Sequence, residues 1–212
     1  MKMTPQKLVV RLTLAVCLGT ALSACAPLIV GGAVVGTMMA TDRRTAGSQI
    51  DDEGIKIRAD NRIKEHLGDR VRVDVTSYNR QVLLTGEVPS ARDKQLVEQV
   101  VSRVDNVRAV INEVAILGSS TLTQRSSDVF VTGKVKASLL DAKDLQFRAF
   151  KVVTERGVTY LMGRVTQREA DLATQITRST AGVQKVVRVL EIITEDELRG
   201  ILPKPSAAGA RR

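Results

Sequence analysis

Two hydrophobic periods alternate along the chain, and their order predicts its elements. From 59 to 67, apolar residues recur every four positions, as on one face of a helix. From 71 to 75, valines alternate with polar residues, as in a half-buried strand. A second strand is expected over 81–88, a second helix after the N-cap candidate Ser90, and a third strand over 110–117. This part of the chain therefore reads α-β-β-α-β.

The same order of elements occurs a second time. Leu-Leu-Thr-Gly-Glu-Val at 83–88 recurs as Tyr-Leu-Met-Gly-Arg-Val at 160–165, 77 positions later. The spacing of the flanking apolar residues repeats as well, so the chain contains two copies of one module of about 70 residues. The elements expected in the second copy are a helix over 128–140, strands over 147–154 and 158–165, a helix over 167–180 and a strand over 186–193.

The expected fold class is α+β, with a three-stranded sheet in each module covered on one face by two helices. Asp51-Asp52-Glu53 is expected at the N-terminus of the first helix, where acids suit the helix dipole. Gly157 is expected in a hairpin turn, and Gly182 after the last helix in the left-handed conformation. Asn106, at the corresponding place in the first module, tolerates that conformation.

The N-terminus has the anatomy of an export signal. Three basic residues precede an uncharged apolar run over 12–22, and Leu22-Ser23-Ala24-Cys25 follows. This tetrapeptide resembles the bacterial lipoprotein box, in which cleavage leaves Cys25 as the first residue and its sulfur is acylated. An ordinary signal peptide with a chance cysteine is the alternative. The run is too short for a transmembrane helix, which needs about 20 apolar residues.

These signals divide the chain into six parts. They are a signal peptide (1–24), a lipidated glycine-rich stalk and linker (25–49), a first module (50–118), a linker (119–124), a second module (125–194) and a flexible tail (195–212).

Composition argues against catalysis and against nucleic acid. His66 is the one histidine, and the only cysteine outside the signal is Cys25, so neither a thiol nor a metal cluster is expected. We expect no cofactor and no enzymatic activity. The sequence pI of about 9.9 suggests nucleic acid for a cytoplasmic protein, but anionic lipid headgroups are the better partner for an exported one.

The positive charge lies in the second module. Residues 51–117 contain 11 basic and 12 acidic side chains, whereas residues 125–193 contain 12 basic and 7 acidic ones. On the first helix of the second module, Phe130 lies roughly 120° from the centre of the apolar stripe, with Lys134 one turn along. An exposed aromatic beside lysines suits a membrane interface. Periodicity alone equally allows Phe130 to fill a gap under the neighbouring module.

Taken together, the lipobox, the Gly-Val-rich segment after it, Thr41-Asp42-Arg43-Arg44 and the two Gly-containing strand motifs resemble the dual-BON-domain outer-membrane lipoproteins. The resemblance implies two tandem BON modules. It also implies binding of anionic phospholipids, such as phosphatidylglycerol and cardiolipin, through the first helix of the second module. On that helix it assigns lipid binding to Val129, Phe130, Gly133, Lys134 and Lys136. Phe130 stands where the family has tryptophan.

The function expected from the resemblance is that of a non-catalytic, lipid-anchored protein that maintains envelope integrity. It would face the periplasm from the outer membrane and gather at the division site. The alternative is an adaptor that docks on outer-membrane assembly or cell-wall proteins through the nearly neutral first module.

Overall fold

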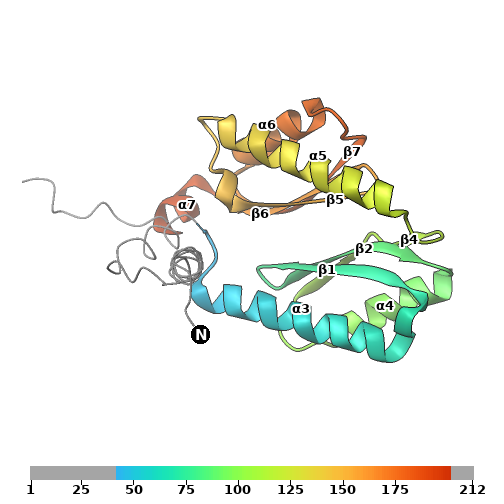
Figure 1. The fold of residues 1–212 in the computed structure, drawn as a ribbon. Helices are drawn as coiled ribbons and strands as arrows, with labels where there is room; N and C mark the ends of the chain where they lie inside the picture. Colours follow the sequence, from blue (N-terminus) through green and yellow to red (C-terminus); the bar gives the residue numbers. More distant parts are fainter. Residues whose placement is uncertain (1–41, 202–212) are drawn as a thin grey trace, which may run out of the picture. The chain divides into compact units, whose positions relative to one another are not determined.

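The computed structural model describes residues 42–201, and within them the α-β-β-α-β order occurs twice, as predicted (Figure 1). The first module contains α3 (Ala46–Leu67), a 3₁₀ turn (Gly68–Arg70), β1 (Arg72–Tyr78), β2 (Gln81–Val88), α4 (Ala91–Ser102), β3 (Ala109–Asn112) and β4 (Ala115–Ile116). The second contains α5 (Leu122–Asp141), a 3₁₀ turn (Phe147–Ala149), β5 (Phe150–Glu155), β6 (Val158–Val165), α6 (Gln167–Ser179) and β7 (Lys185–Ile192), followed by α7 (Glu195–Ile201).

Both sheets have the same topology. In the first, β2 is central, antiparallel to β1 and parallel to β3 and β4. In the second, β6 is antiparallel to β5 and parallel to β7. Helices α3 and α4 cover one face of the first sheet, and α5 and α6 cover one face of the second (Figure 1). The predicted fold class is therefore confirmed.

Each module has an aliphatic core between its helices and its sheet. In the first, Ile55, Ala59 and Ile63 of α3 meet Val97 of α4 and Leu84 of β2. In the second, the corresponding core is formed by the buried stripe of α5 and by apolar residues of β5, β6 and α6. These cores use the residues that the helical and strand periods select.

A third apolar cluster joins the two modules. It contains Tyr78 and Leu83 of the first sheet together with Tyr160, Met162 and Val189 of the second. Along β2 and β6, these residues alternate with those that face the helices, so each sheet buries both faces. Leu83 and Tyr160 occupy equivalent positions of the repeat, and each contributes to the cluster.

Several elements begin or end away from the predicted positions. Helix α3 begins at Ala46, after the N-cap Thr45, so part of the expected linker is helical and the Asp51-Asp52-Glu53 acids lie inside the helix. Helix α5 begins at Leu122, within the second predicted linker, because Thr121 and Gln124 form a capping box. The expected tail begins with the helix α7. The strand predicted over 110–117 is divided into β3 and β4.

The turns follow the prediction closely. Asn79 and Arg80 have φ of 51° and 64°, and Arg156 and Gly157 have φ of 51° and 74°. Both hairpins therefore have two left-handed central residues, which suits the twist of the strands. Gly182 has a φ of 100°. Asn106, the residue at the corresponding place in the first module, has a φ of 70°.

Candidate lipid-binding surface

The first helix of the second module, α5, is apolar on two opposite faces. Val131, Val135 and Leu139 are buried against the sheet and α6. Leu122, Val129 and Leu140 are 74%, 73% and 58% exposed. At 3.6 residues per turn these three lie within roughly 40° of one another, across the helix from the buried stripe. A helix of a soluble protein ordinarily presents polar residues there, so the outer stripe indicates a contact with another apolar surface.

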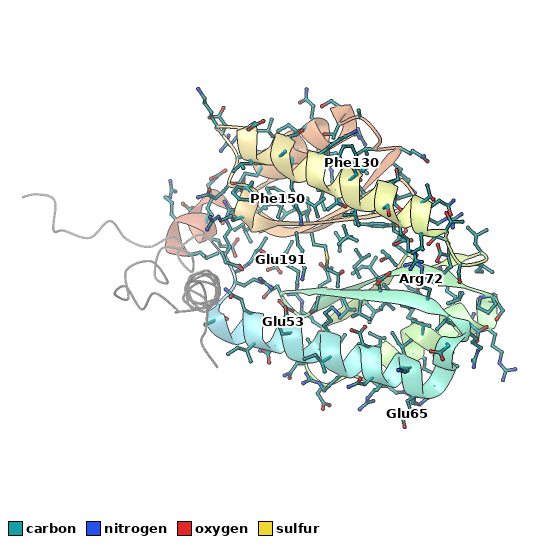
Figure 2. All side chains as sticks on the ribbon, in the orientation of Figure 1. Glu53, Glu65, Arg72, Phe130, Phe150 and Glu191 are labelled. Carbon is teal, nitrogen blue, oxygen red and sulfur yellow. The ribbon has the colours of Figure 1, made fainter. Side chains whose placement is uncertain are left out.

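Phe130 lies roughly 80–100° around the helix from this outer stripe and is 66% exposed (Figure 2). The Nζ atom of Lys134 lies 4.6 Å from the centre of its ring, and the same atom donates to the carbonyl of Ala181 at 3.4 Å. The alternative that Phe130 fills a gap under the neighbouring module is therefore wrong. The contact with Lys134 covers part of the ring with a flexible alkyl chain that also carries a cation.

The residues expected to bind lipid span about 160° of the circumference of α5, at 100° per residue. Val129, Gly133 and Lys136 are exposed, as is Phe130, while Lys134 is half-buried. We call this surface of α5, with Leu122 and Leu140, the outer face of α5. Cys25, the expected lipidation site, lies outside the described residues.

Asp128 holds α5 in place, a role that the sequence did not reveal. Its carboxylate accepts hydrogen bonds from the backbone amides of Arg156 at 2.8 Å and Gly157 at 2.9 Å. Because these amides form the β5–β6 turn, Asp128 fixes the helix to the sheet directly beside Val129 and Phe130. It is 7% exposed.

Asp52 has the same role in the first module, so its expected place at a helix N-terminus is wrong. It accepts from the backbone amides of Asn79 and Arg80, both at 2.8 Å, and from the hydroxyl of Ser77 at 2.6 Å. Burial alone would raise the pKa of Asp52, but these bonds and that from Arg44 outweigh it and lower the pKa below its ordinary value. Asp52 and Asp128 lie 76 positions apart, at equivalent places in the first helices of the two modules. This repetition was the sequence signal for their shared role.

A cleft of about 770 Å³ adjoins one side of α5. It is bounded by α3, β1, β2, α5 and β5, and its lining includes Val129, Gly133 and Lys136 of the outer face of α5. Strands β1 and β5 are the outermost strands of their sheets on this side. The cleft is therefore continuous with the surface expected to bind lipid.

Charged residues link the two modules beside this cleft. Arg72 (labelled in Figure 2) contacts Glu155, and Glu87 accepts from Arg72 at 2.7 Å and from Arg156 at 3.0 Å. Burial would raise the pKa of Glu87, but the two guanidinium groups lower it. Burial raises the pKa of Glu155 despite its contact with Arg72. The network fixes the walls of the cleft.

Residues 42–201 contain no group of three or more His, Cys, Asp or Glu side chains placed to hold a metal ion. In the same part of the chain, none of the helices is long and apolar enough to span a bilayer.

The fold and the repeat define a class of small α+β modules used in tandem. The BON domain family model matches residues 51–118 and again residues 127–194, and the chain belongs to this family, with two BON domains.

Two relatives match most of the chain in sequence. The chain is 33% identical to the outer membrane lipoprotein DolP of Haemophilus influenzae over 184 residues, covering 85% of this chain and 95% of that protein. It is 31% identical to a 21 kDa hemolysin of Actinobacillus pleuropneumoniae over 154 residues, covering 72% and 79% respectively. The chain thus belongs among dual-BON proteins like DolP.

Proposed function

We propose that this protein is a non-catalytic lipoprotein of the outer membrane that binds anionic phospholipids through α5 and thereby supports envelope integrity. The observation that carries the proposal is the outer face of α5, where apolar residues stand exposed opposite the buried stripe. Its similarity to a protein named as an outer membrane lipoprotein supports the location.

Cations beside the outer face favour anionic lipid. Arg125 and Lys136 are exposed on the same side of the helix, and within residues 42–201 neither side chain forms an ion pair. Each cation near an anionic surface contributes about 1 kcal/mol. Lys134, now over the ring of Phe130, has the reach to follow a headgroup phosphate when the ring enters the interface.

Gly133 is informative because the fold does not require it. A glycine inside a helix costs about 0.5–1 kcal/mol relative to alanine, yet a Cβ added at Gly133 would have no atom within 4 Å. A glycine at the middle of the outer face lets another surface approach the helix backbone closely.

Vesicle flotation of residues 42–201 tests the proposal, since this piece contains all three apolar clusters. Burial of a phenylalanine contributes about 1.5–3 kcal/mol, so Phe130→Glu should weaken binding to phosphatidylglycerol vesicles at least tenfold. The matched control is Ile57→Glu on α3, which alters an equally accessible apolar residue, 59% exposed, at the position equivalent to Gly133. Equal binding to phosphatidylcholine vesicles, or unchanged binding by Phe130→Glu, would contradict the proposal.

Acylation of Cys25 has its own test. Cells that express the full chain should incorporate labelled palmitate into the parent protein and not into Cys25→Ser. Cys17→Ser should incorporate the label as the parent does. Retention of label by Cys25→Ser would refute the anchor without affecting the proposal for α5.

A further inference from the structure

The cleft beside α5 follows the free edge of strand β5. Its lining includes four consecutive residues of that strand, Val152, Val153, Thr154 and Glu155. Successive side chains of a strand point to opposite faces of its sheet, so a cavity that meets all four lies against the edge of the strand. Within residues 42–201, β5 pairs with β6 alone. The cleft therefore gives access to the backbone of β5.

The register of the hairpin shows which backbone groups point into the cleft. A two-residue turn joins β5 to β6, so the flanking pair Glu155 and Val158 is hydrogen-bonded. Hydrogen-bonded and non-hydrogen-bonded pairs alternate along an antiparallel ladder. The N–H and C=O groups of Val153 are therefore directed at β6, whereas those of Val152 and Thr154 are directed at the cleft.

These outward groups of β5 have no partner in the described part of the chain. In the first hairpin, the same register directs the carbonyl of Ser77 away from β2, and it accepts from the Nζ atom of Lys151 at 3.1 Å. Within residues 42–201, no backbone group of Val152 or Thr154 forms a hydrogen bond outside the β5–β6 pairing. An unpaired strand edge is a template for a further strand.

A buried hydroxyl beside this edge also lacks a partner. Thr85 lines the cleft, is 1% exposed, and shares with Leu83 the face of β2 that is turned to the second module. Its Oγ1 atom has no hydrogen-bond partner among the described residues, whereas the similarly buried Thr154 shares a hydrogen bond of 3.1 Å with Thr159. An unpaired buried hydroxyl is costly, so this one indicates a polar group of a ligand in the cleft.

The charges of the cleft favour a ligand without net charge. Each module contributes two cations and two acids to the lining, namely Lys56, Arg72, Asp60 and Asp74 from the first and Arg125, Lys136, Asp128 and Glu155 from the second. Both walls are therefore balanced. A peptide backbone carries no charge and supplies one donor and one acceptor per residue, which matches the open edge of β5.

The two walls of the cleft fit different side chains. Alternate side chains of a strand added to β5 would face α5 and the first module in turn. On the side of α5, Val129 is apolar, and a Cβ added at Gly133 would meet no atom within 4 Å. On the side of the first module, Thr76 and Thr85 present hydroxyl groups. The best match is a segment in which apolar residues alternate with uncharged polar ones.

We propose that an extended, uncharged segment of another protein, with alternating apolar and polar residues, adds to the edge of β5 as a further strand. Its backbone pairs with Val152 and Thr154, and one of its polar side chains bonds to the hydroxyl of Thr85. The tail of the chain itself does not fit, because Pro203 and Pro205 lack the amide donor that pairing requires. The inference goes beyond the proposed function, since it assigns a protein partner to the second module.

A capped hexapeptide of alternating valine and threonine is the probe, titrated against residues 42–201 by nuclear magnetic resonance. Two further forms carry N-methyl groups, one on every valine and the other on every threonine. Only one set of amides can face β5, so one form should bind at least about tenfold more weakly and the other within about threefold of the unmodified peptide. Undiminished binding of both forms would overturn strand addition.

Amide hydrogen exchange locates the edge. In the free protein, the amides of Val152 and Thr154 should exchange faster than that of Val153, which is bonded to β6. Saturating peptide should slow the first two at least about tenfold and leave Val153 within about twofold. Protection that is confined to α5, or absent from β5, would refute the assignment.

Variants of the protein test the same contacts. Thr154→Pro removes an outward amide and leaves the β5–β6 ladder intact, as edge strands allow. It should weaken peptide binding at least about tenfold, whereas Thr154→Val, which keeps the amide, should bind within about twofold of the parent. Thr85→Val should weaken binding about threefold. Unchanged binding by a folded Thr154→Pro would contradict the proposal, and thermal unfolding shows that each variant is folded.

Two comparisons establish the source of the segment and its independence from lipid. Phe130→Glu should bind the peptide as the parent does, because Phe130 does not line the cleft, so failure of the lipid proposal leaves this one intact. Residues 26–212 should bind within about twofold of residues 42–201. Binding at least about tenfold weaker would identify a segment of the chain itself as the occupant. A dimer of residues 42–201 that the peptide dissociates would identify a second copy, and either result would overturn the assignment to another protein.

Discussion

Asp52 and Asp128 show how a single side chain can organise a whole module. Each sits on the first helix and accepts hydrogen bonds from two backbone amides of the hairpin turn. Those turn amides have no strand partner, and a carboxylate satisfies them more strongly than water because the bonds are charge-assisted. The interaction also sets the position of the helix along the sheet.

Replacing Asp52 should destabilise the first module. Asp52→Asn loses acceptors for several short hydrogen bonds and leaves Arg44 without one partner, so we expect a loss of about 2–4 kcal/mol in the free energy of unfolding at pH 7. Urea denaturation measures it. Asp69→Asn, an exposed acid beyond the end of α3, is the control and should change stability by less than about 0.5 kcal/mol.

The difference in stability between the parent and Asp52→Asn should depend on pH. Since the folded-state pKa of Asp52 is lowered, its contribution is present above the unfolded pKa of about 3.9 and is lost as the pH falls through the folded value. The stability difference between the parent and Asp52→Asn should therefore shrink as the pH falls below about 4. A difference that is constant from pH 7 to pH 3 would exclude this linkage.

At the scale of elements, α5 differs from its counterpart α3 although both occupy the same place in the repeat. The position of Val129 is Glu53 in α3, and that of Lys136 is Asp60. The outer face of α5 is thus apolar and basic where α3 carries acids. The two helices share the buried stripe and differ on the exposed side, and the proposed binding of anionic lipid by the second module rests on that difference.

Replacing Gly133 and Gly182 by alanine should change the free energy of unfolding in opposite directions. Gly133→Ala should raise the free energy of unfolding by about 0.5–1 kcal/mol, because the helix gains propensity and the added Cβ meets no atom within 4 Å. Gly182→Ala should lower it by at least about 1 kcal/mol. Its φ is 100°, and a Cβ would lie 2.6 Å from Val131 Cγ2. Thermal unfolding of both variants checks the pair, and destabilisation by Gly133→Ala would show a structural need for that glycine.

At the scale of the whole molecule, residues 42–45, which precede α3, form a clasp: their side chains contact both modules. Arg43 donates to both carboxylate oxygens of Glu169, at 2.6 and 2.7 Å, with both side chains buried. Next to it, Arg44 pairs with Asp52 and lies 4.5 Å from the centre of the Tyr78 ring. The segment expected to be a linker therefore contacts both modules.

Removing one partner of the Arg43–Glu169 pair should lower the free energy of unfolding by more than the intact pair contributes to it. Arg43→Met leaves the carboxylate of Glu169 buried without its cation, so unfolding should become easier by about 3–5 kcal/mol. Adding Glu169→Gln should recover part of this loss, because the glutamine side chain carries no charge and its oxygen can still accept from the backbone amide of Thr166. Arg168→Met, an exposed neighbour, is the control. Urea denaturation of the parent, Arg43→Met, Glu169→Gln and the double variant gives the coupling energy, and a double variant no more stable than Arg43→Met would contradict the explanation.

The sequence by itself determined the two α-β-β-α-β modules, their cores and their turns. These follow from local rules: apolar periods of two and 3.6 residues, and a few residues that tolerate positive φ. Of the residues expected to bind lipid on α5, Val129, Phe130, Gly133 and Lys136 are exposed and Lys134 is half-buried. Helix starts were less predictable, because Thr45 and Thr121 begin helices within segments whose polarity suggested linkers.

Only the tertiary structure decided how charged and polar residues are used. Arg43 meets Glu169 across 126 positions, and Arg72 meets Glu155 across 83. No local period marks such partners, since a charge in a sequence has the same appearance whether it is solvated or buried in a pair. The cleft beside α5 and the unpaired hydroxyl of Thr85 arise in the same way, from walls that belong to two modules. Folding brings those walls together because the third apolar cluster buries the outer faces of both sheets.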